Sequence, residues 1–285
     1  METVRLIAEV KAKDSIQLWD LEREKWILQT LREMSEKQAI PWNYLQSIYH
    51  IMFSLSITHQ AKIIGNGNMP NFSNAIDFTM PFLLQLPNNA KLRITFQGEL
   101  GAFSHLAISS VFPKATAIPS WQFDDVKEKL DKNIADLAIL PFFNTIAGTV
   151  NLGQKIADHI EHVVLYKFPI KIRHMLAVPN HIEDIGQIET VYSHPEALRQ
   201  CKNFLTKHGI RGISYHDTAG AAKMIAEYSP QNSAALCSEM AANLYGLHIL
   251  KRDVQDIKNN FTFFALVAKT SSLPQIVKQL VEFNV

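Results

Sequence analysis

Apolar positions repeat with two different periods along the chain, and the period changes about a third of the way along. Residues 1–64 contain one proline and no glycine, and apolar side chains recur there every three or four positions, as at Leu45 and Ile48. That spacing predicts amphipathic helices, one from about Ser15 and another over residues 41–64.

From Leu92 onward, short apolar runs alternate with helical patterns. The runs are RITF, ADLAILP, TVYS, ISY, AALCS and FFALVA, and the helical segments begin near Ala102, Phe123, Thr149, Pro195, Thr218 and Glu239. This alternation predicts an α/β fold with mostly parallel sheets. A break over residues 169–179 predicts two lobes, with the chain returning to the first lobe at its terminal strand.

These patterns divide the chain into four parts. We expect a helical region over residues 1–64, a linker rich in Gly, Asn and Pro over 65–91, an α/β domain over 92–269, and a C-terminal helix within 270–285. The first lobe is predicted to comprise residues 92–170 with about 258–269, and the second lobe about 171–257.

The charge balance and the cysteines narrow the classes of partner. The chain holds 28 basic and 27 acidic residues mixed along its length, with a net charge of +1, so nucleic acid and anionic membranes are disfavoured. Cys201 and Cys237 are too few for a disulfide framework and are typical of buried thiols in a reducing compartment. The N-terminus lacks the apolar core of a signal peptide, and no stretch approaches the ~20 apolar residues of a membrane-spanning helix. We therefore expect a cytoplasmic protein.

The candidate chemistry centres on the sequence NNFTFFALVAK at residues 259–269. Its apolar part predicts a strand buried on both faces, and Thr262 lies at the start of that strand. Because ligands gather at strand ends in parallel sheets, the Thr262 hydroxyl is expected to donate a hydrogen bond to a substrate.

Several other segments have features that suit an anion. The sequence GELGAFSH at residues 98–105 follows a strand and opens a helix, so its backbone N–H groups are expected to face a carboxylate, with Ser104 adding a hydroxyl. His194, Thr218 and Ser238 are predicted to cap three further helices. Each cap alone is an ordinary feature of a helix start, but several caps aimed at one cleft favour an anion site.

Two histidines have a spacing that occurs in metal sites. His159 and His162 lie three residues apart on a predicted helix, a spacing that zinc ligands can have. The sequence offers no evident third ligand, and an exposed polar helix face explains the pair better. We therefore predict no metal site.

The order of the motifs resembles that of the prephenate dehydratase family. The matching segments are SHP at 193–195, DTAGA at 217–221, SEMA at 238–241, YGL at 245–247 and NFT at 260–262. The resemblance covers about residues 92–269 and implies two lobes like those of a periplasmic binding protein, with the site in the cleft. It also implies an enzyme of phenylalanine biosynthesis that removes water and carbon dioxide from prephenate to give phenylpyruvate, without a cofactor.

The resemblance assigns roles to individual residues. Thr262, Asn144 and Thr145 take the positions of the family's catalytic residues. The substrate-binding positions correspond to Gly101, Ala102, Ser104, His194, Thr218, Ser238 and Phe263. A positioned hydroxyl such as that of Thr262 would stabilise the leaving oxygen or relay a proton to it.

Three positions depart from the family pattern. Phe263 stands where the family has an arginine, Phe143 where it has a glutamate, and Lys167 where it has a second glutamate. A buried ion pair replaced by two aromatic rings can be nearly neutral for stability, but it changes the cleft. Three interpretations stay open: a working dehydratase, a non-aromatising prephenate decarboxylase, and a catalytically silent protein that binds prephenate for regulation.

The N-terminal helices look like the chorismate mutase module that often precedes this family in one chain. The matching residues are Lys13, Asp20, Arg23, Glu24 and Gln60. The family's first helix supplies two arginines that clamp the substrate carboxylates, and this chain is expected to start too late to contain them. Because each charge-assisted hydrogen bond is worth about 1.5–3 kcal/mol, mutase activity on chorismate is expected to be weak or absent. The helices would then serve to form a homodimer.

The C-terminal segment resembles the opening of the ACT domain, the phenylalanine sensor that usually follows this family. Ser272 is predicted to cap a helix there. So short a segment cannot build the sensor, and we expect no feedback by phenylalanine through that site.

Overall fold

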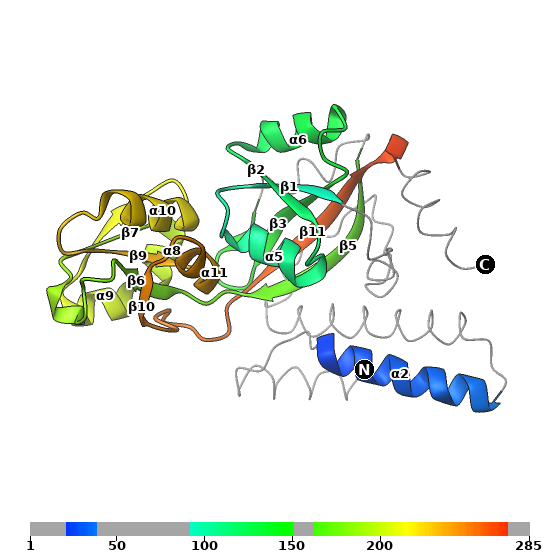
Figure 1. The fold of residues 1–285 in the computed structure, drawn as a ribbon, viewed down its shortest axis with the longest axis horizontal. Coiled ribbons are helices and arrows are strands. Elements are labelled where there is room, and N and C mark those ends of the chain that lie inside the picture. Colours follow the sequence, from blue (N-terminus) through cyan, green and yellow to red (C-terminus); the bar gives the residue numbers. More distant parts are fainter. Residues whose placement is uncertain (1–20, 39–91, 151–161, 273–285) are drawn as a thin grey trace.

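The apolar runs predicted as strands all form strands, and these sort into two mixed sheets, one in each lobe (Figure 1). The structure is a computed structural model that describes residues 21–38, 92–150 and 162–272. Predictions that fall elsewhere, including those for Lys13, Asp20, Gln60 and His159, the linker and the C-terminal helix, lie outside the described residues.

The first sheet has the strand order β2-β1-β3-β11-β5, with β4 paired to β3. Its strands are β1 (Arg93–Gln97), β2 (Thr116–Ser120), β3 (Leu137–Asn144), β4 (Gly148–Thr149), β5 (His162–Lys171) and β11 (Phe261–Lys269). The second sheet has the order β10-β6-β9-β7-β8. Its strands are β6 (Met175–Val178), β7 (Thr190–Ser193), β8 (Arg211–Ser214), β9 (Ser233–Cys237) and β10 (His248–Lys251).

The prediction of mostly parallel sheets is wrong. Strand β1 is parallel to β2 and β3, and β7 is parallel to β8 and β9, but β11 runs antiparallel to both of its neighbours, β3 and β5. Strand β6 is likewise antiparallel to β9 and β10. The cause is the route of the chain, because β5 leaves the first lobe at the edge where β11 re-enters it, and the two strands must run in opposite directions.

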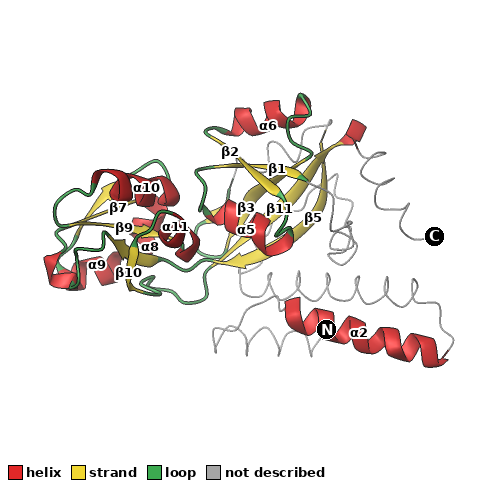
Figure 2. Ribbon diagram, viewed as in Figure 1, coloured by secondary structure: helices red, strands yellow, loops and turns green. Residues whose placement is uncertain are grey.

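The described helices are α2 (Leu21–Gln38), α5 (Phe103–Val111), α6 (Phe123–Asp131), α8 (Pro195–Gln200), α9 (Lys202–His208), α10 (Thr218–Tyr228) and α11 (Glu239–Leu244), with short 3-10 turns at Ile185–Gln187 and Thr270–Ser272. Of these, α5, α6, α8, α9, α10 and α11 pack against the two sheets (Figure 2). Four of the predicted helix starts are confirmed, and α5 begins one residue later than predicted. The start predicted at Thr149 falls in β4 instead.

Helix α2 contains two of the residues that resemble the mutase site, Arg23 and Glu24. Among the described residues, no helix has both the length and the apolar character that a membrane crossing requires.

Three apolar clusters form the core. On one face of the first sheet, Ile94 and Leu266 pack with Ile108 of α5, and this cluster continues into the second lobe through Ala222 of α10 and Ala241 of α11. On the opposite face, Val126 and Leu130 of α6 pack on Leu140 and Val267. The third cluster lies in the second lobe and includes Leu176, Val191 and Leu205. One of the three clusters therefore spans both lobes, and each lobe has a further cluster of its own.

Polar side chains cap the helices that begin at the junction of the lobes. His194 Nδ1 accepts a hydrogen bond from Glu196 N at the start of α8, and Ser238 Oγ accepts one from Ala241 N at the start of α11. These two predicted caps are confirmed. The third is a correction: Asp217 caps α10 by accepting from Gly220 N, and Thr218 is the first helical residue.

The glycine turn at residues 98–101 packs tightly against the second lobe. Gly101 has a φ of +91°, and a Cβ added there would lie 2.7 Å from the backbone Cα of Ala241. Only glycine fits both the dihedral angle and the space. The turn is held further by Ser238 Oγ donating to Gly101 O (2.6 Å) and Tyr245 Oη donating to Leu100 O (2.8 Å).

Comparing alanine substitutions at two glycines should separate backbone strain from a steric clash. Gly209 has a φ of +66°, and no atom lies within 4 Å of a Cβ added there. We therefore expect Gly209→Ala to lower the free energy of unfolding only through its left-handed backbone conformation, by about 1–2 kcal/mol. Gly101→Ala adds overlap with Ala241 and should cost a further ~1–3 kcal/mol. Urea unfolding of both variants measures the difference. Equal losses in the two variants would contradict the tight contact between the lobes.

Candidate active site

A buried asparagine organises the polar groups at the edge of the first sheet. Asn144, the last residue of β3, is opposite Thr262 of β11 in register. Its Nδ2 donates to Thr262 Oγ1 (2.9 Å) and to Asn260 Oδ1 (2.8 Å). Its Oδ1 accepts from the backbone N–H groups of Ile146 and Ala147 at 2.9 and 2.8 Å. These four bonds fix which end of the Asn144 carboxamide donates.

The same directionality extends into the second lobe. Asn260 Nδ2 donates to Gln200 Oε1 (2.7 Å), and Gln200 Nε2 donates to Glu196 Oε1 (2.8 Å). Because Gln200 Oε1 only accepts, the 3.0 Å contact of His174 Nε2 with it requires that this nitrogen carry the proton. A continuous polar network thus joins Thr262 to helix α8, and it includes Asn260, Gln200 and His174, none of which is among the residues predicted to bind or act on the substrate.

The hydroxyl of Thr262 has a defined role within this network. An amide nitrogen can only donate, so Thr262 Oγ1 is the acceptor of the bond from Asn144. Its own proton makes no hydrogen bond within the described part of the chain. Thr262 is partly exposed, and its hydroxyl proton is therefore available to a ligand.

Thr145 has a different place. Its Oγ1 accepts from Phe261 N (3.0 Å) and donates to Asn259 O (3.4 Å), so both functions of the hydroxyl are used within the protein. These bonds join the end of β3 to the start of β11. In this conformation Thr145 positions the segment that carries Thr262.

The glycine turn uses several of its own polar groups. Glu99 N donates to Asp217 Oδ2 (3.1 Å), Gly101 N to His105 Nδ1 (2.9 Å) and Ala102 N to Glu99 O (3.0 Å). In this conformation the N–H of Glu99 faces the carboxylate of Asp217, and the N–H groups of residues 101 and 102 bond within the turn and the start of α5, so none of the three is free for the carboxylate of a ligand.

The remaining predicted substrate contacts differ in access. Ser104 and Ala102 are buried. The hydroxyl of Ser238 donates to Gly101 O and accepts from Ala241 N. Thr218 is partly exposed at the start of α10.

A small cavity of about 300 Å³ lies between the lobes beside the turn. It is lined by Gln97, Gly98 and Trp121 of the first lobe and by His194, His216 and Asp217 of the second. Of the residues predicted to bind substrate, His194 is the one that lines it. Helix α8 begins next to His194 at the cavity and ends at Gln200 of the polar network, so this helix connects the two.

Two aromatic residues at this cavity were missed because nothing in their local sequence marks them. The rings of Trp121 and His216 come from different lobes, and their centroids lie 4.5 Å apart. The ring of Tyr215 also contacts His216, with the centroids 4.5 Å apart and the planes tilted by 41°. Trp121 is 62% exposed. Only the folded chain brings these rings together across the lobes.

The two aromatic departures from the family pattern face each other. Phe143 and Phe263 are register partners on β3 and β11, with ring centroids 6.1 Å apart, and each is 2% exposed. Phe263 belongs to the cluster under α6, so its ring does not reach a ligand in this conformation; the expectation of a substrate contact is corrected on this ground. Lys167 pairs with Ala265, further along β11.

The histidine predicted on a helix lies on a strand. His162 is the first residue of β5, is 1% exposed, and contacts Asp131 Oδ1 through Nε2 at 3.2 Å. No cluster of metal-ligating side chains occurs among the described residues.

Burial shifts the proton affinity of the histidines near the site. Desolvation is the largest cause in each case, and it lowers the pKa of His105, His174 and His194. His174 is the most buried, and its Nδ1 has no hydrogen-bond partner. A proton added at that nitrogen would create an unpaired buried cation, which favours the neutral ring.

Comparison with known proteins decides the family. Residues 94–272 match the family model described as prephenate dehydratase, and residues 1–61 match that of chorismate mutase type II. The chain belongs to the prephenate dehydratase family. Its fold is the two-lobed α/β fold of that family, preceded by a segment of the mutase type.

Three relatives illustrate the extent of the similarity. Arogenate dehydratase/prephenate dehydratase 2 of Arabidopsis thaliana is 37% identical over 66% of this chain and 49% of its own length. A bifunctional chorismate mutase/prephenate dehydratase of Buchnera aphidicola is 30% identical over 92% of this chain and 65% of that protein. The structure of the Arthrobacter aurescens prephenate dehydratase in complex with L-Phe has 25% identity and a TM-score of 0.57, covering 62% of this chain and 60% of that one. This member of the family thus spans about half to two thirds of these relatives.

Stability should depend on pH through buried His174. The pKa of His174 in the folded state lies below that of a free imidazole, so the unfolded chain binds more protons as pH falls through about 6.5, and the free energy of unfolding falls by up to ~1.4 kcal/mol per pH unit. We expect His174→Asn to reduce this slope by up to one proton. Urea unfolding between pH 5 and 8 measures it, with the exposed His248→Asn as control. A slope in His174→Asn as steep as in the wild type would rule out the neutral buried ring.

Charges introduced at Phe143 and Phe263 should affect stability as a pair. An arginine alone at position 263 would have no partner, so Phe263→Arg should lower the free energy of unfolding by about 3–5 kcal/mol. Adding Phe143→Glu should restore part of the loss, because the two positions are adjacent in register. A double-mutant cycle by denaturant unfolding gives the coupling, and Phe263→Leu controls for lost volume. Strictly additive losses would show that the two positions do not interact.

Proposed function

We propose that this chain acts on prephenate as a dehydratase and forms phenylpyruvate, carbon dioxide and water. Membership of the family supports the reaction class. The observation that carries the proposal is the hydrogen bond from Asn144 Nδ2 to Thr262 Oγ1, because it leaves the Thr262 proton to be donated to a substrate.

The chemistry requires one proton and no redox partner. The bond between the ring and its carboxylate breaks, its electron pair moves into the ring, and the bond from the ring to its hydroxyl breaks at the far end. One proton joins the leaving oxygen to form water, and aromatisation supplies the driving force. The protein therefore has to hold the substrate and stabilise the leaving oxygen.

In this proposal Thr262 is the catalytic residue and Asn144 and Thr145 position it. A threonine hydroxyl is a weak acid, but a fixed O–H directed at the leaving oxygen stabilises the charge that develops there. Asn144 holds the oxygen of that hydroxyl, and Thr145 holds the backbone on both sides of the strand start. Phe143 and Phe263 line the core behind this site and leave the hydroxyl in place.

We place the substrate between the small cavity and the polar network. His194 and Thr218 stand at the starts of the two helices that face this space. The carboxylate of Asp217 also lines the cavity, and its oxygens already accept from Gly220 N and Glu99 N. Entry of a dianion therefore requires that the contact between Asp217 and the glycine turn loosen.

Other properties remain parts of the proposal. We propose that the protein works in the cytoplasm, consistent with its two buried free thiols. Desolvation raises the pKa of the Cys237 thiol to about 12. We also propose that the protein forms a homodimer. Arogenate is a second candidate substrate, since the Arabidopsis relative is named for both compounds. Residual mutase activity would rest on Lys13, Asp20, Arg23, Glu24 and Gln60.

Removing the hydroxyl tests the assignment of Thr262. Losing one hydrogen-bond donor to a developing charge typically lowers kcat by about 10²–10³-fold, and we expect that loss in Thr262→Ala. Thr262→Ser keeps the hydroxyl and should retain most of the activity. The measurement is phenylpyruvate formation from prephenate, run in parallel with arogenate as the substrate.

Binding measurements separate the remaining interpretations. Calorimetry with prephenate should give similar affinity for the wild type and Thr262→Ala if the hydroxyl acts on the leaving group. Equal turnover by the two proteins would remove Thr262 from the mechanism. Binding of prephenate without turnover by the wild type would instead favour a silent regulatory protein.

A further inference from the structure

The side chain of Gln200 joins the hydrogen bonds of the two lobes. Gln200 is the last residue of α8 in the second lobe, and it is 7% exposed. Its Oε1 accepts from Asn260 Nδ2 at 2.7 Å and from His174 Nε2 at 3.0 Å, and its Nε2 donates to Glu196 Oε1 at 2.8 Å. Asn260 directly precedes β11, so the bond from Asn260 to Gln200 connects the first lobe to the second.

Neighbours on two sides fix the orientation of the Gln200 carboxamide. The Glu196 carboxylate also accepts from Arg199 Nε at 2.9 Å, and as an anion it can only accept from Gln200. The Asn260 nitrogen, on the other side, can only donate. A reversed Gln200 carboxamide would place its nitrogen against an N–H group and its oxygen against a carboxylate. The observed orientation is therefore the one that suits both neighbours.

The orientation of Asn260 depends in turn on Gln200. Asn260 is buried, and its Oδ1 accepts from Asn144 Nδ2 at 2.8 Å while its Nδ2 donates to Gln200. A reversed Asn260 would bring two amide nitrogens together at Asn144 and two carbonyl oxygens together at Gln200, and both bonds would be lost. Without the acceptor at Gln200, that reversal would cost only the bond to Asn144. Gln200 therefore helps to hold the Asn144 nitrogen in the position from which it donates to Thr262 Oγ1.

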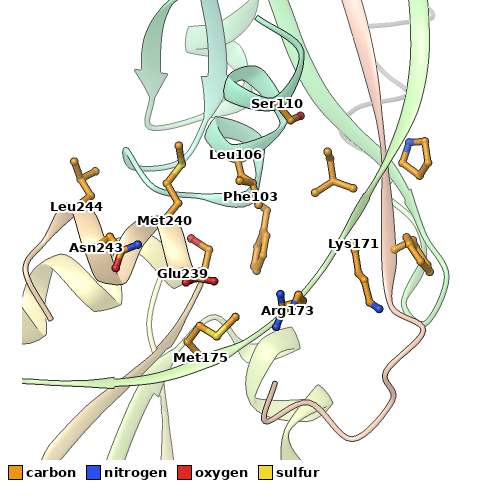
Figure 3. Close-up of a pocket in the computed structure, with 14 residues that line it drawn as sticks. Phe103, Leu106, Ser110, Lys171, Arg173, Met175, Glu239, Met240, Asn243 and Leu244 are labelled. Carbon is orange, nitrogen blue, oxygen red and sulfur yellow. The ribbon is translucent and has the colours of Figure 1, made fainter. Parts of the chain in front are cut away.

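Gln200 lines neither the small cavity nor the larger cavity between α5 and α11. The larger cavity has a volume of about 840 Å³, and Phe103 of α5 points into it (Figure 3). Its lining includes Phe261 and Ile170, the chain neighbour and the register partner of Thr262. A ligand in either cavity would thus contact residues near the polar network but not Gln200 itself. Any effect of Gln200 on the reaction therefore passes through its hydrogen-bonded neighbours.

We propose, on the basis of the role proposed for Thr262, that Gln200 is a positioning residue for the reaction. It acts through Asn260 and Asn144 to fix the Thr262 oxygen, and with it the directions in which the hydroxyl proton can be donated. Because Gln200 and Thr262 belong to different lobes, the hydroxyl is held in this way only when the lobes are docked. Separation of the lobes would break the bond between Gln200 and Asn260 and leave the hydroxyl less well aligned.

A double-mutant cycle in kcat tests this role on the full chain. Gln200→Leu removes the acceptor and the donor and keeps much of the side-chain volume. We expect it to lower kcat for prephenate about 10–100-fold with little change in KM, because misalignment of a catalytic group costs rate and not binding. In a Thr262→Ala background the same substitution should change kcat by less than about twofold, because the hydroxyl that it would misalign is absent.

Two further variants separate positioning from a general loss of structure. The combined substitutions Gln200→Glu and Glu196→Gln exchange donor and acceptor between the two positions, keep an acceptor for Asn260 and conserve the net charge. This variant should recover kcat to within about threefold of the wild type. Gln231→Leu makes the same chemical change at an exposed glutamine of the second lobe, and it should leave kcat and KM unchanged. Thermal unfolding verifies that each variant is folded.

Hydrogen exchange gives a readout that does not require turnover. The N–H groups of Ile146 and Ala147 donate to Asn144 Oδ1, and a loosened carboxamide would expose both to exchange. Their exchange rates should rise about 2–10-fold in Gln200→Leu, as expected for the loss of one hydrogen bond, and stay unchanged in Gln231→Leu. Wild-type exchange and kcat in Gln200→Leu would overturn the role of Gln200. Losses that simply multiply when Gln200→Leu is combined with Thr262→Ala would do the same.

The single variant Thr262→Ala distinguishes this failure from a failure of the proposed function. If Thr262→Ala turns over prephenate as fast as the wild type, the catalytic role of Thr262 falls and the role of Gln200 falls with it. If Thr262→Ala is impaired while Gln200→Leu is not, the assignment of Thr262 stands and only the role of Gln200 is overturned.

Discussion

The orientation of one carboxamide determines the polar chemistry at the junction of the lobes. Asn144 is buried, and its oxygen is committed to two backbone N–H groups in the turn after β3. Its nitrogen must therefore donate, and every donor and acceptor from Thr262 to Glu196 follows from that choice. These hydrogen bonds make the network rigid, because a reversal of the Asn144 carboxamide would leave its buried donors and acceptors unpaired in a low dielectric.

The second constraint is steric and holds the lobes together. The approach of Gly101 to Ala241 brings the turn of the first lobe against α11 of the second. Hydrogen bonds from Ser238 and Tyr245 and the ion pair between Lys223 and Glu99 cross the same boundary. The small cavity is lined by residues of both lobes. Its size and lining are therefore properties of the docked arrangement, and a motion of the lobes would change both.

Local patterns were enough to predict many of the elements, but not their pairing. Apolar runs and capping residues predicted β1, β3, β7, β8, β9 and β11 and most helix starts from residue 92 onward, because burial and capping are local requirements, whereas β2, β4, β5, β6 and β10 were not predicted. The antiparallel course of β11 depends on where the chain re-enters the first lobe, which no local period encodes. The same limit applies to the site. Thr262 and Asn144 belong to recognisable motifs, whereas the ring contact between Trp121 and His216 and the hydrogen bond from Asn260 to Gln200 each join residues more than forty positions apart.

The position of β11 has a consequence for how the protein is made. Strand β11 lies between β3 and β5, so the first sheet has a gap at its centre until the last strand arrives. The second sheet uses only strands from β6 to β10, which are contiguous in the chain. During synthesis the second lobe can therefore close while the first still exposes the unpaired backbone edges of two strands. Such edges are prone to pair with other chains, and the lobe that begins first is completed last.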